Sequence, residues 1–181
     1  ADTSNFILTY ENKPINAFYH GSNGGVSARA SESWQMQDYS YFTATMDGSK
    51  TLNKIFNFPI SSESELNNFL EFDKKQFYGS NHSLFRWTKK VSNLQIKEKL
   101  IKNKLIGINE TVLNLSVIER GASGRVTKLM IQTNTVNKSI VLVKDDIRRV
   151  LSFIPSNLFT INKLSDDLWL LKGGGFGHGV G

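Results

Sequence analysis

Two runs of alternating apolar and polar residues, joined by a glycine-containing turn, restrict the fold of this chain more than any other feature. The runs are TVLNLSVIER and RVTKLMIQT, and residues 121–124 (GASG) separate them. Successive side chains of a β-strand point to opposite faces, so each run presents one apolar face. The pattern predicts an antiparallel hairpin whose buried face contains Val112, Leu113 or Leu115, Val117, Val126, Leu129 and Ile131.

Other runs predict further strands and short helices. SIVLV continues the sheet, and LFTINKL and DLWLLK form a second strand pair around residues 165–167. Helices are expected in SSESELNNFLEF, after Ser92 or Asn93, and in KDDIRRVLSF, because each has a capping residue or acidic residues at its start. SLFRWT is typical of a short strand, and residues 6–10 and 15–20 of an N-terminal hairpin. We therefore expect an α+β fold with antiparallel β-hairpins, a sheet and about three short helices, in a single domain spanning residues 1–181.

Composition restricts the possible partners. The net charge of +6 and the pI near 9.5 favour anionic partners, although AT-rich coding, which inflates the lysine and asparagine content, would also give a basic chain. The chain contains no recognisable nucleic-acid module and its basic residues are dispersed, so no nucleic-acid partner is expected. No apolar stretch approaches the roughly 18 to 20 residues of a membrane span, and no signal peptide is visible. The absence of cysteine excludes disulfides and thiolate zinc sites.

The chain ends on KGGGFGHGVG, where glycines surround a single histidine, His178. A dinucleotide fingerprint needs a glycine at its sixth position, but counting from Gly175 that position is Val180. A nucleotide site is therefore not expected, and no cofactor is predicted. Glycines also allow a backbone to approach a ligand or another backbone closely. The sequence favours such a close-approach loop, and a flexible end of the chain is the alternative.

Five stretches, in order along the chain, support a family assignment. PINAFYHGSNGG is followed by SESW, and ERGASGRVTKLMI, DDIRRVL, IPSNLFTI and GGGFGHGVG come later. Together they resemble the SpoIID/LytB family, the stage II sporulation protein D and amidase-enhancer group. The resemblance covers essentially the whole chain, which is similar to about the C-terminal two-thirds of the family domain.

The resemblance implies a role at the cell wall. Family members with known activity are lytic transglycosylases that cleave peptidoglycan glycan strands, preferably strands without stem peptides. One carboxylic acid acts in turn as general acid and general base. The family's catalytic glutamate lies in an N-terminal segment that has no counterpart here, so no catalytic residue is assigned and the acid is expected upstream of Ala1. The alternative is a non-catalytic wall-binding or amidase-enhancing module.

The resemblance also implies partners, a location and binding residues. The expected partners are peptidoglycan glycan strands and a cell-wall amidase, and the expected location is the cell envelope or periplasm after export. Some members bind zinc through a histidine and cysteines; His20 matches the histidine, but the cysteines are absent, so no metal is expected. The candidate substrate-binding residues match two family motifs and are His20, Ser22, Gly24, Gly25, Glu32, Trp34, Gly175, Gly177, His178 and Gly179.

Two of these candidates have plainer interpretations as well. Glu32 also fits a solvated loop charge, and Trp34 also fits a core or loop-anchoring residue. His20 and His178 are expected to face each other and to line a saccharide groove.

Overall fold

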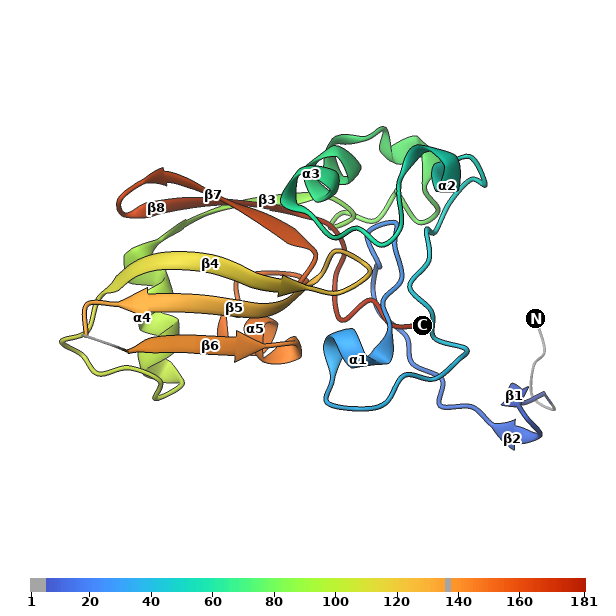
Figure 1. The fold of residues 1–181 in the computed structure, drawn as a ribbon, viewed down its shortest axis with the longest axis horizontal. Helices are drawn as coiled ribbons and strands as arrows, with labels where there is room; N and C mark the ends of the chain where they lie inside the picture. The colour runs from blue at the N-terminus through green and yellow to red at the C-terminus, as the bar shows by residue number, and fades with distance from the viewer. Residues whose placement is uncertain (1–5, 136–137) are drawn as a thin grey trace.

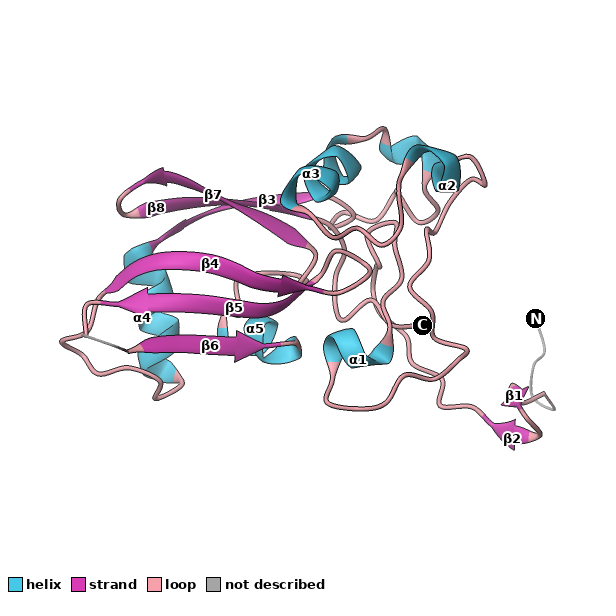
Figure 2. Ribbon diagram, viewed as in Figure 1, coloured by secondary structure: helices cyan, strands magenta, loops and turns pink. Residues whose placement is uncertain are grey.

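The computed structural model describes residues 6–135 and 138–181, and it confirms the α+β class (Figures 1 and 2). Within these residues, eight strands pair in antiparallel fashion and five short α-helices and one 3-10 helix accompany them. The strands are β1 Thr9–Tyr10, β2 Lys13–Pro14, β3 Trp87–Ser92, β4 Val112–Arg120, β5 Val126–Thr133, β6 Ser139–Val143, β7 Phe159–Ser165 and β8 Leu168–Gly173. The helices are α1 Ala30–Ser33, α2 Leu52–Ile55, α3 Glu63–Glu71, η1 Lys74–Gln76, α4 Asn93–Lys102 and α5 Asp145–Val150.

Two three-stranded sheets form one half of the molecule. Their strand orders are β3-β8-β7 and β4-β5-β6, and they lie one above the other in Figure 1. Between them lies a core of buried apolar side chains to which both sheets and helices α4 and α5 contribute, because one face of each strand is apolar. Its members include Trp87, Val91, Ile96, Leu100, Leu115, Leu129, Ile131, Ile147, Trp169 and Leu171.

The hairpin predicted from the alternating pattern is β4–β5. Strand β4 pairs with β5 from Val112↔Thr133 to Arg120↔Val126, and residues 121–124 form the connection. Of the two alternative core positions, Leu115 is 7% exposed and Leu113 is 51% exposed, so Leu115 is the inward residue. The buried positions Val112 and Leu115 are three residues apart, instead of two or four, because the pairing register of β4 with β5 is irregular between Val112 and Asn114.

The three predicted helices are α3, α4 and α5. Both α3 and α4 begin with a capping box, in which Ser62 and Ser92 accept from the backbone N–H groups of Glu65 and Gln95. Helices α1 and α2 were not predicted, because four residues give too little periodicity to detect. The strand expected in SLFRWT begins only at Trp87 and runs on to Ser92.

The prediction of a long N-terminal hairpin is wrong in its extent. Strands β1 and β2 have two residues each and project from the body of the molecule (Figure 1). Phe6 is 81% exposed and Ile7 and Leu8 are similarly exposed, so aromatic and β-branched residues here have no core to cover them. A hairpin without such a core gains too little from side-chain contacts to extend.

The other half of the molecule is largely irregular backbone, and it contains helices α1, α2 and α3 (Figure 2). No helix among the described residues combines the length and apolar character needed to cross a lipid bilayer.

Candidate functional site

The two segments that carry the candidate motifs, residues 20–25 and residues 173–181, lie side by side although most of the chain separates them. The N–H of Ser22 donates to the carbonyl of Phe176 at 3.1 Å, and the N–H of Phe176 donates back to Ser22 at 2.8 Å. A β-carbon on Gly175 would lie 2.7 Å from the carbonyl oxygen of Ser22, and one on Gly24 would lie 2.7 Å from the carbonyl carbon of Gly174. The glycines thus permit a close backbone approach, as the sequence predicted.

Residues 173–181, the glycine segment, are held from the sheet side. The indole N–H of Trp87 donates to the carbonyl of Gly175 at 3.2 Å, and the hydroxyl of Ser156 donates to Gly174 at 2.6 Å. The N–H of Gly177 donates to Pro155 at 3.0 Å. Gly174, Gly175, Gly179 and Val180 are also buried, so much of the segment packs against the body of the molecule, whereas Phe176 is exposed.

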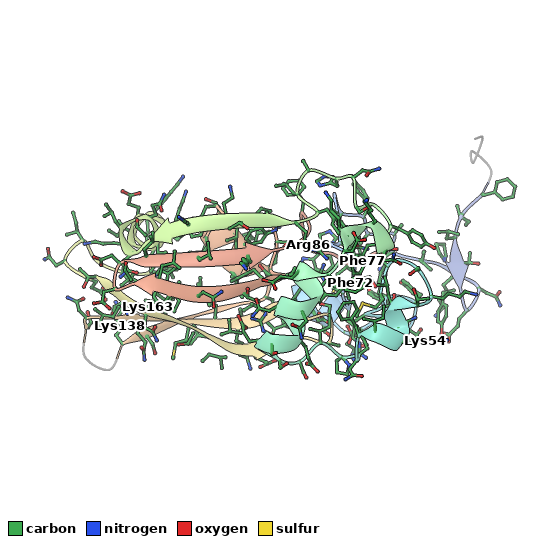
Figure 3. The ribbon with its side chains drawn as sticks, turned by 90° about the horizontal axis from the view of Figure 1, so that it is seen from above. Lys54, Phe72, Phe77, Arg86, Lys138 and Lys163 are labelled. Atoms are coloured by element: carbon green, nitrogen blue, oxygen red, sulfur yellow. The ribbon has the colours of Figure 1, made fainter. Side chains whose placement is uncertain are left out.

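Arg86 holds the first segment, residues 20–25, from the same side. Its guanidinium donates to the carbonyl of Gly24 at 2.7 Å and lies over the rings of Phe69, Phe77 and Phe85, with Phe77 beside it in Figure 3. Burial lowers the pKa of Arg86 to about 10, so it remains charged at neutral pH. Cation–π contacts offset part of the free energy lost in desolvating this charge.

The backbone N–H and carbonyl groups of Val180 orient both histidines. The N–H of Val180 donates to Nδ1 of His178 at 3.1 Å, and Nδ1 of His20 lies 3.0 Å from the carbonyl oxygen of Val180. A carbonyl only accepts, so Nδ1 of His20 carries a proton, whereas Nδ1 of His178 does not. The two rings therefore differ in whether Nδ1 carries a proton, and Nε2 of His20 is the ring nitrogen left to contact a ligand.

Burial lowers the pKa of His178 below its ordinary value of 6.5. Nearby His20 lowers it further, Asp145 raises it and Arg148 lowers it. The hydrogen bonding also favours a lowered pKa. Protonation of Nδ1 of His178 would place a donor against the N–H of Val180, which is itself a donor. His178 is consequently neutral at neutral pH.

A pH dependence of stability follows. Because the folded-state pKa of His178 lies below that of the unfolded chain, the unfolded state binds more protons, and the free energy of unfolding falls as the pH drops below about 6.5. His178→Asn keeps an acceptor for Val180 but cannot titrate. We expect urea denaturation across this range to show a smaller loss of stability for the variant than for wild type. Parallel curves for the two proteins would contradict the assignment.

Trp34 packs on His178, one member of the histidine pair. Its ring centroid lies 4.6 Å from that of His178 and 4.9 Å from that of Phe18, while the rings of His20 and His178 are 6.0 Å apart. The hydroxyl of Ser33 donates to the carbonyl of His178 at 3.1 Å, which ties helix α1 to the glycine segment. Trp34 is half-buried, so it both anchors the loop and keeps part of its ring accessible.

Two pockets lie beside this pair. The first, the histidine pocket, has a volume of about 440 Å³ and is lined by His20, Gly21, Ser22, Asn23, Asp47, Tyr78, Gly79, Asn81 and His82. The second, the tryptophan pocket, has about 280 Å³ and contains Trp34 together with residues of helix α5. Sequence analysis missed Asp47, Tyr78 and Asn81, because they lie in irregular segments whose only signal is their position in the fold.

Glu32 lines neither of these two pockets. It is 5% exposed, so the interpretation as a solvated loop charge is wrong. Its carboxylate accepts from the backbone N–H of Ser123 at 3.3 Å and from the Ser123 hydroxyl. The loop after β4 approaches this closely because Gly121 has no side chain, as a β-carbon there would lie 2.5 Å from the Glu32 carboxyl carbon.

Arg125 completes the support beneath the glycine segment. It is fully buried and donates to the carbonyls of Asn23 at 2.8 Å and Val26 at 3.1 Å, so it fixes the backbone at the end of the first segment. Burial lowers the pKa of Arg125 to about 10, and the charge of Glu32 opposes this shift. The buried carboxylate thus compensates a buried cation.

Apart from Glu32, the candidate residues divide into two groups. His20, Ser22, Trp34 and His178 line or adjoin the two pockets, and the glycines let the backbones that carry them meet. Among the residues that the structure describes, no group of three or more histidine, aspartate or glutamate side chains is arranged to hold a metal ion.

Comparison with protein families gives a match. The model of a family described as "Domain of unknown function (DUF8618)" matches residues 28–181, which include Glu32, Trp34 and the glycine segment. No curated protein matches the chain.

Proposed function

This chain belongs to the DUF8618 family, whose description names no function, and from its site we propose that it binds the glycan strands of peptidoglycan. One observation carries the proposal: the two segments that resemble SpoIID/LytB motifs pair with each other and place His20 and His178 6.0 Å apart beside Trp34. The pairing brings the two motifs to one place on the molecule, and this supports a shared site.

The chemistry of the histidine pocket suits a sugar ring. Saccharides present apolar ring faces and several hydroxyl groups, so they need both an aromatic surface and hydrogen-bonding groups. Tyr78, at 65% exposure, offers its ring to the pocket. The amide of Asn81 and Nε2 of His20 offer hydrogen bonds, and Asp47, held by the amide of Asn23 at 2.6 Å, offers a carboxylate to hydroxyl donors.

Neither His20 nor His178 is proposed as the general acid. Glu32 is committed to Ser123, and the family glutamate has no counterpart in residues 1–181. With a glutamate supplied by a preceding segment, the domain would act as a lytic transglycosylase in the cell envelope; without one, it would bind the wall or assist an amidase. Release of 1,6-anhydro-muramic ends from denuded strands by the full protein distinguishes these two forms of the proposal.

Binding itself is tested with denuded glycan strands and two variants. We expect His20→Ala and Tyr78→Ala each to weaken binding about tenfold, since each removes one aromatic or hydrogen-bonding contact of about 1.4 kcal/mol. Isothermal titration calorimetry measures the affinities. Tyr19→Ala is the matched control, because Tyr19 is exposed but its side chain lies outside the lining of the pocket.

Two results would overturn the proposal. One is a wild-type protein that binds no glycan; the other is a Tyr19→Ala variant that loses as much affinity as Tyr78→Ala. Circular dichroism of each variant separates lost contacts from lost structure.

A further inference from the structure

Lys89 occupies a position on strand β3 where the pattern of the sheet calls for an apolar residue. It lies on the same strand face as Trp87 and Val91, both of which are buried in the core between the sheets. Its cross-strand neighbour on β8 is Leu171, which is buried as well. A charged side chain here must leave the core edge with its ammonium group toward solvent.

Lys89 is exposed, and it lines a pocket on this side of the sheet. A cavity of about 370 Å³, the lysine pocket, is lined by Lys89, Arg148 and Arg149 and by the apolar side chains of Leu84, Phe153 and Phe176, among others. Leu84 and Phe153 pack against the same core cluster as Trp87. The pocket therefore has an apolar floor continuous with the core and a cationic rim.

The two arginines of this rim are already neutralised, whereas Lys89 is not. Arg148 donates to both carboxylate oxygens of Asp145, at 3.0 and 2.9 Å, and Arg149 lies 3.2 Å from the carboxylate of Asp146. In residues 6–135 and 138–181, no carboxylate lies within ion-pair distance of Lys89. The lysine pocket thus keeps one uncompensated positive charge.

Phe176 is the wall between the lysine pocket and the histidine pocket. Its ring lines the lysine pocket and stacks on His82, with centroids 6.3 Å apart and planes at 17°. It also covers Gly21 so closely that a β-carbon there would lie 2.6 Å from Cδ1 of Phe176. Both His82 and Gly21 line the histidine pocket, so Phe176 adjoins both pockets.

Resting on the proposed function, we propose that the lysine pocket binds the lactyl carboxylate of a muramic acid residue while a neighbouring sugar occupies the histidine pocket. Lys89 contacts the carboxylate, and the apolar floor contacts the methyl group of the lactyl ether. The strand is thereby selected for its acidic sugar, and a neutral chain of N-acetylglucosamine fits the histidine pocket but leaves Lys89 unpaired.

The test compares three ligands of equal length by calorimetry: a stem-peptide-free strand fragment, the same fragment with its lactyl carboxylates converted to methylamides, and a chitin oligosaccharide. We expect wild type to bind the acidic fragment about tenfold more tightly than the other two, with the preference shrinking at high salt. Lys89→Gln should lose this preference and keep its affinity for the neutral ligands. Lys90→Gln is the matched control, since Lys90 is the next residue of the strand and lies on the opposite face.

Each other outcome has a definite meaning. Equal binding of all three ligands by wild type, or an unchanged preference in Lys89→Gln, would overturn this inference and leave glycan binding intact. A free stem peptide that competes with the fragment in wild type but not in Lys89→Gln would overturn the lactyl assignment. If wild type binds none of the three ligands, the proposed function fails together with the inference.

Discussion

Replacing Trp87 with alanine is expected to lower the free energy of unfolding by about 4 kcal/mol, the usual loss when a buried tryptophan side chain is removed. Trp87 is 7% exposed, its indole lies against the backbone of Gly173, and its N–H donates to the carbonyl of Gly175. The variant therefore loses core contacts and one of the bonds that hold the glycine segment. Urea denaturation measures the change, and we expect binding at the histidine pocket to weaken with it.

Trp87→Phe is the matched variant, because it keeps an aromatic ring and loses only the N–H and part of the apolar area. We expect a loss of about 1–2 kcal/mol, the sum of one hydrogen bond and a small cavity. If Trp87→Phe proves as damaging as Trp87→Ala, the N–H contact to Gly175 dominates and the packing interpretation is wrong. If neither variant changes stability, Trp87 has no anchoring role.

Replacing Gly179 with alanine is expected to cost about 3 kcal/mol for two separable reasons. Gly179 has φ of +79°, a conformation that costs an L-residue roughly 1–2 kcal/mol. A β-carbon at this position would also overlap Nη2 and Cζ of Arg125, which is too enclosed to move aside, and such overpacking adds about 1–3 kcal/mol. Thermal or chemical denaturation measures the total.

Gly79→Ala separates the two contributions. Gly79 has φ of +66°, similar to that of Gly179, but nothing lies within 4 Å of its hypothetical β-carbon. We expect this variant to lose only the conformational part, about 1–2 kcal/mol. Equal losses at the two positions would show that Arg125 accommodates the extra methyl group and that the overlap has no energetic consequence.

The features that sequence predicted correctly rest on short-range physics. The β4–β5 hairpin follows from a period of two, and helices α3 and α4 from serine caps paired with Glu65 and Gln95. The same rules predicted two long strands in residues 6–20, a segment that packs against no core. In the structure, each of these strands has only two residues. Local preference needs tertiary burial to produce an extended strand.

The residues of the candidate site could be predicted from the sequence only in part. His20, Trp34 and His178 were identified from motifs, but the burial of Glu32 and the presence of Asp47 and Tyr78 in the histidine pocket depend on where distant irregular segments meet. Lys89 is an intermediate case. Its strand was visible only in part, yet a lysine at a core-facing position becomes conspicuous once the pairing with Leu171 is known.

The hydrogen bond from His20 to Val180 joins residues 160 positions apart in the chain, and this spacing has a consequence for folding. Closing so long a loop is entropically unfavourable until the sheets already hold its ends near each other. The strand pairs β4–β5 and β7–β8 are local and can form as the chain emerges. We therefore expect the two histidines to meet only after the sheets hold their segments near each other, so that the binding site forms late in folding.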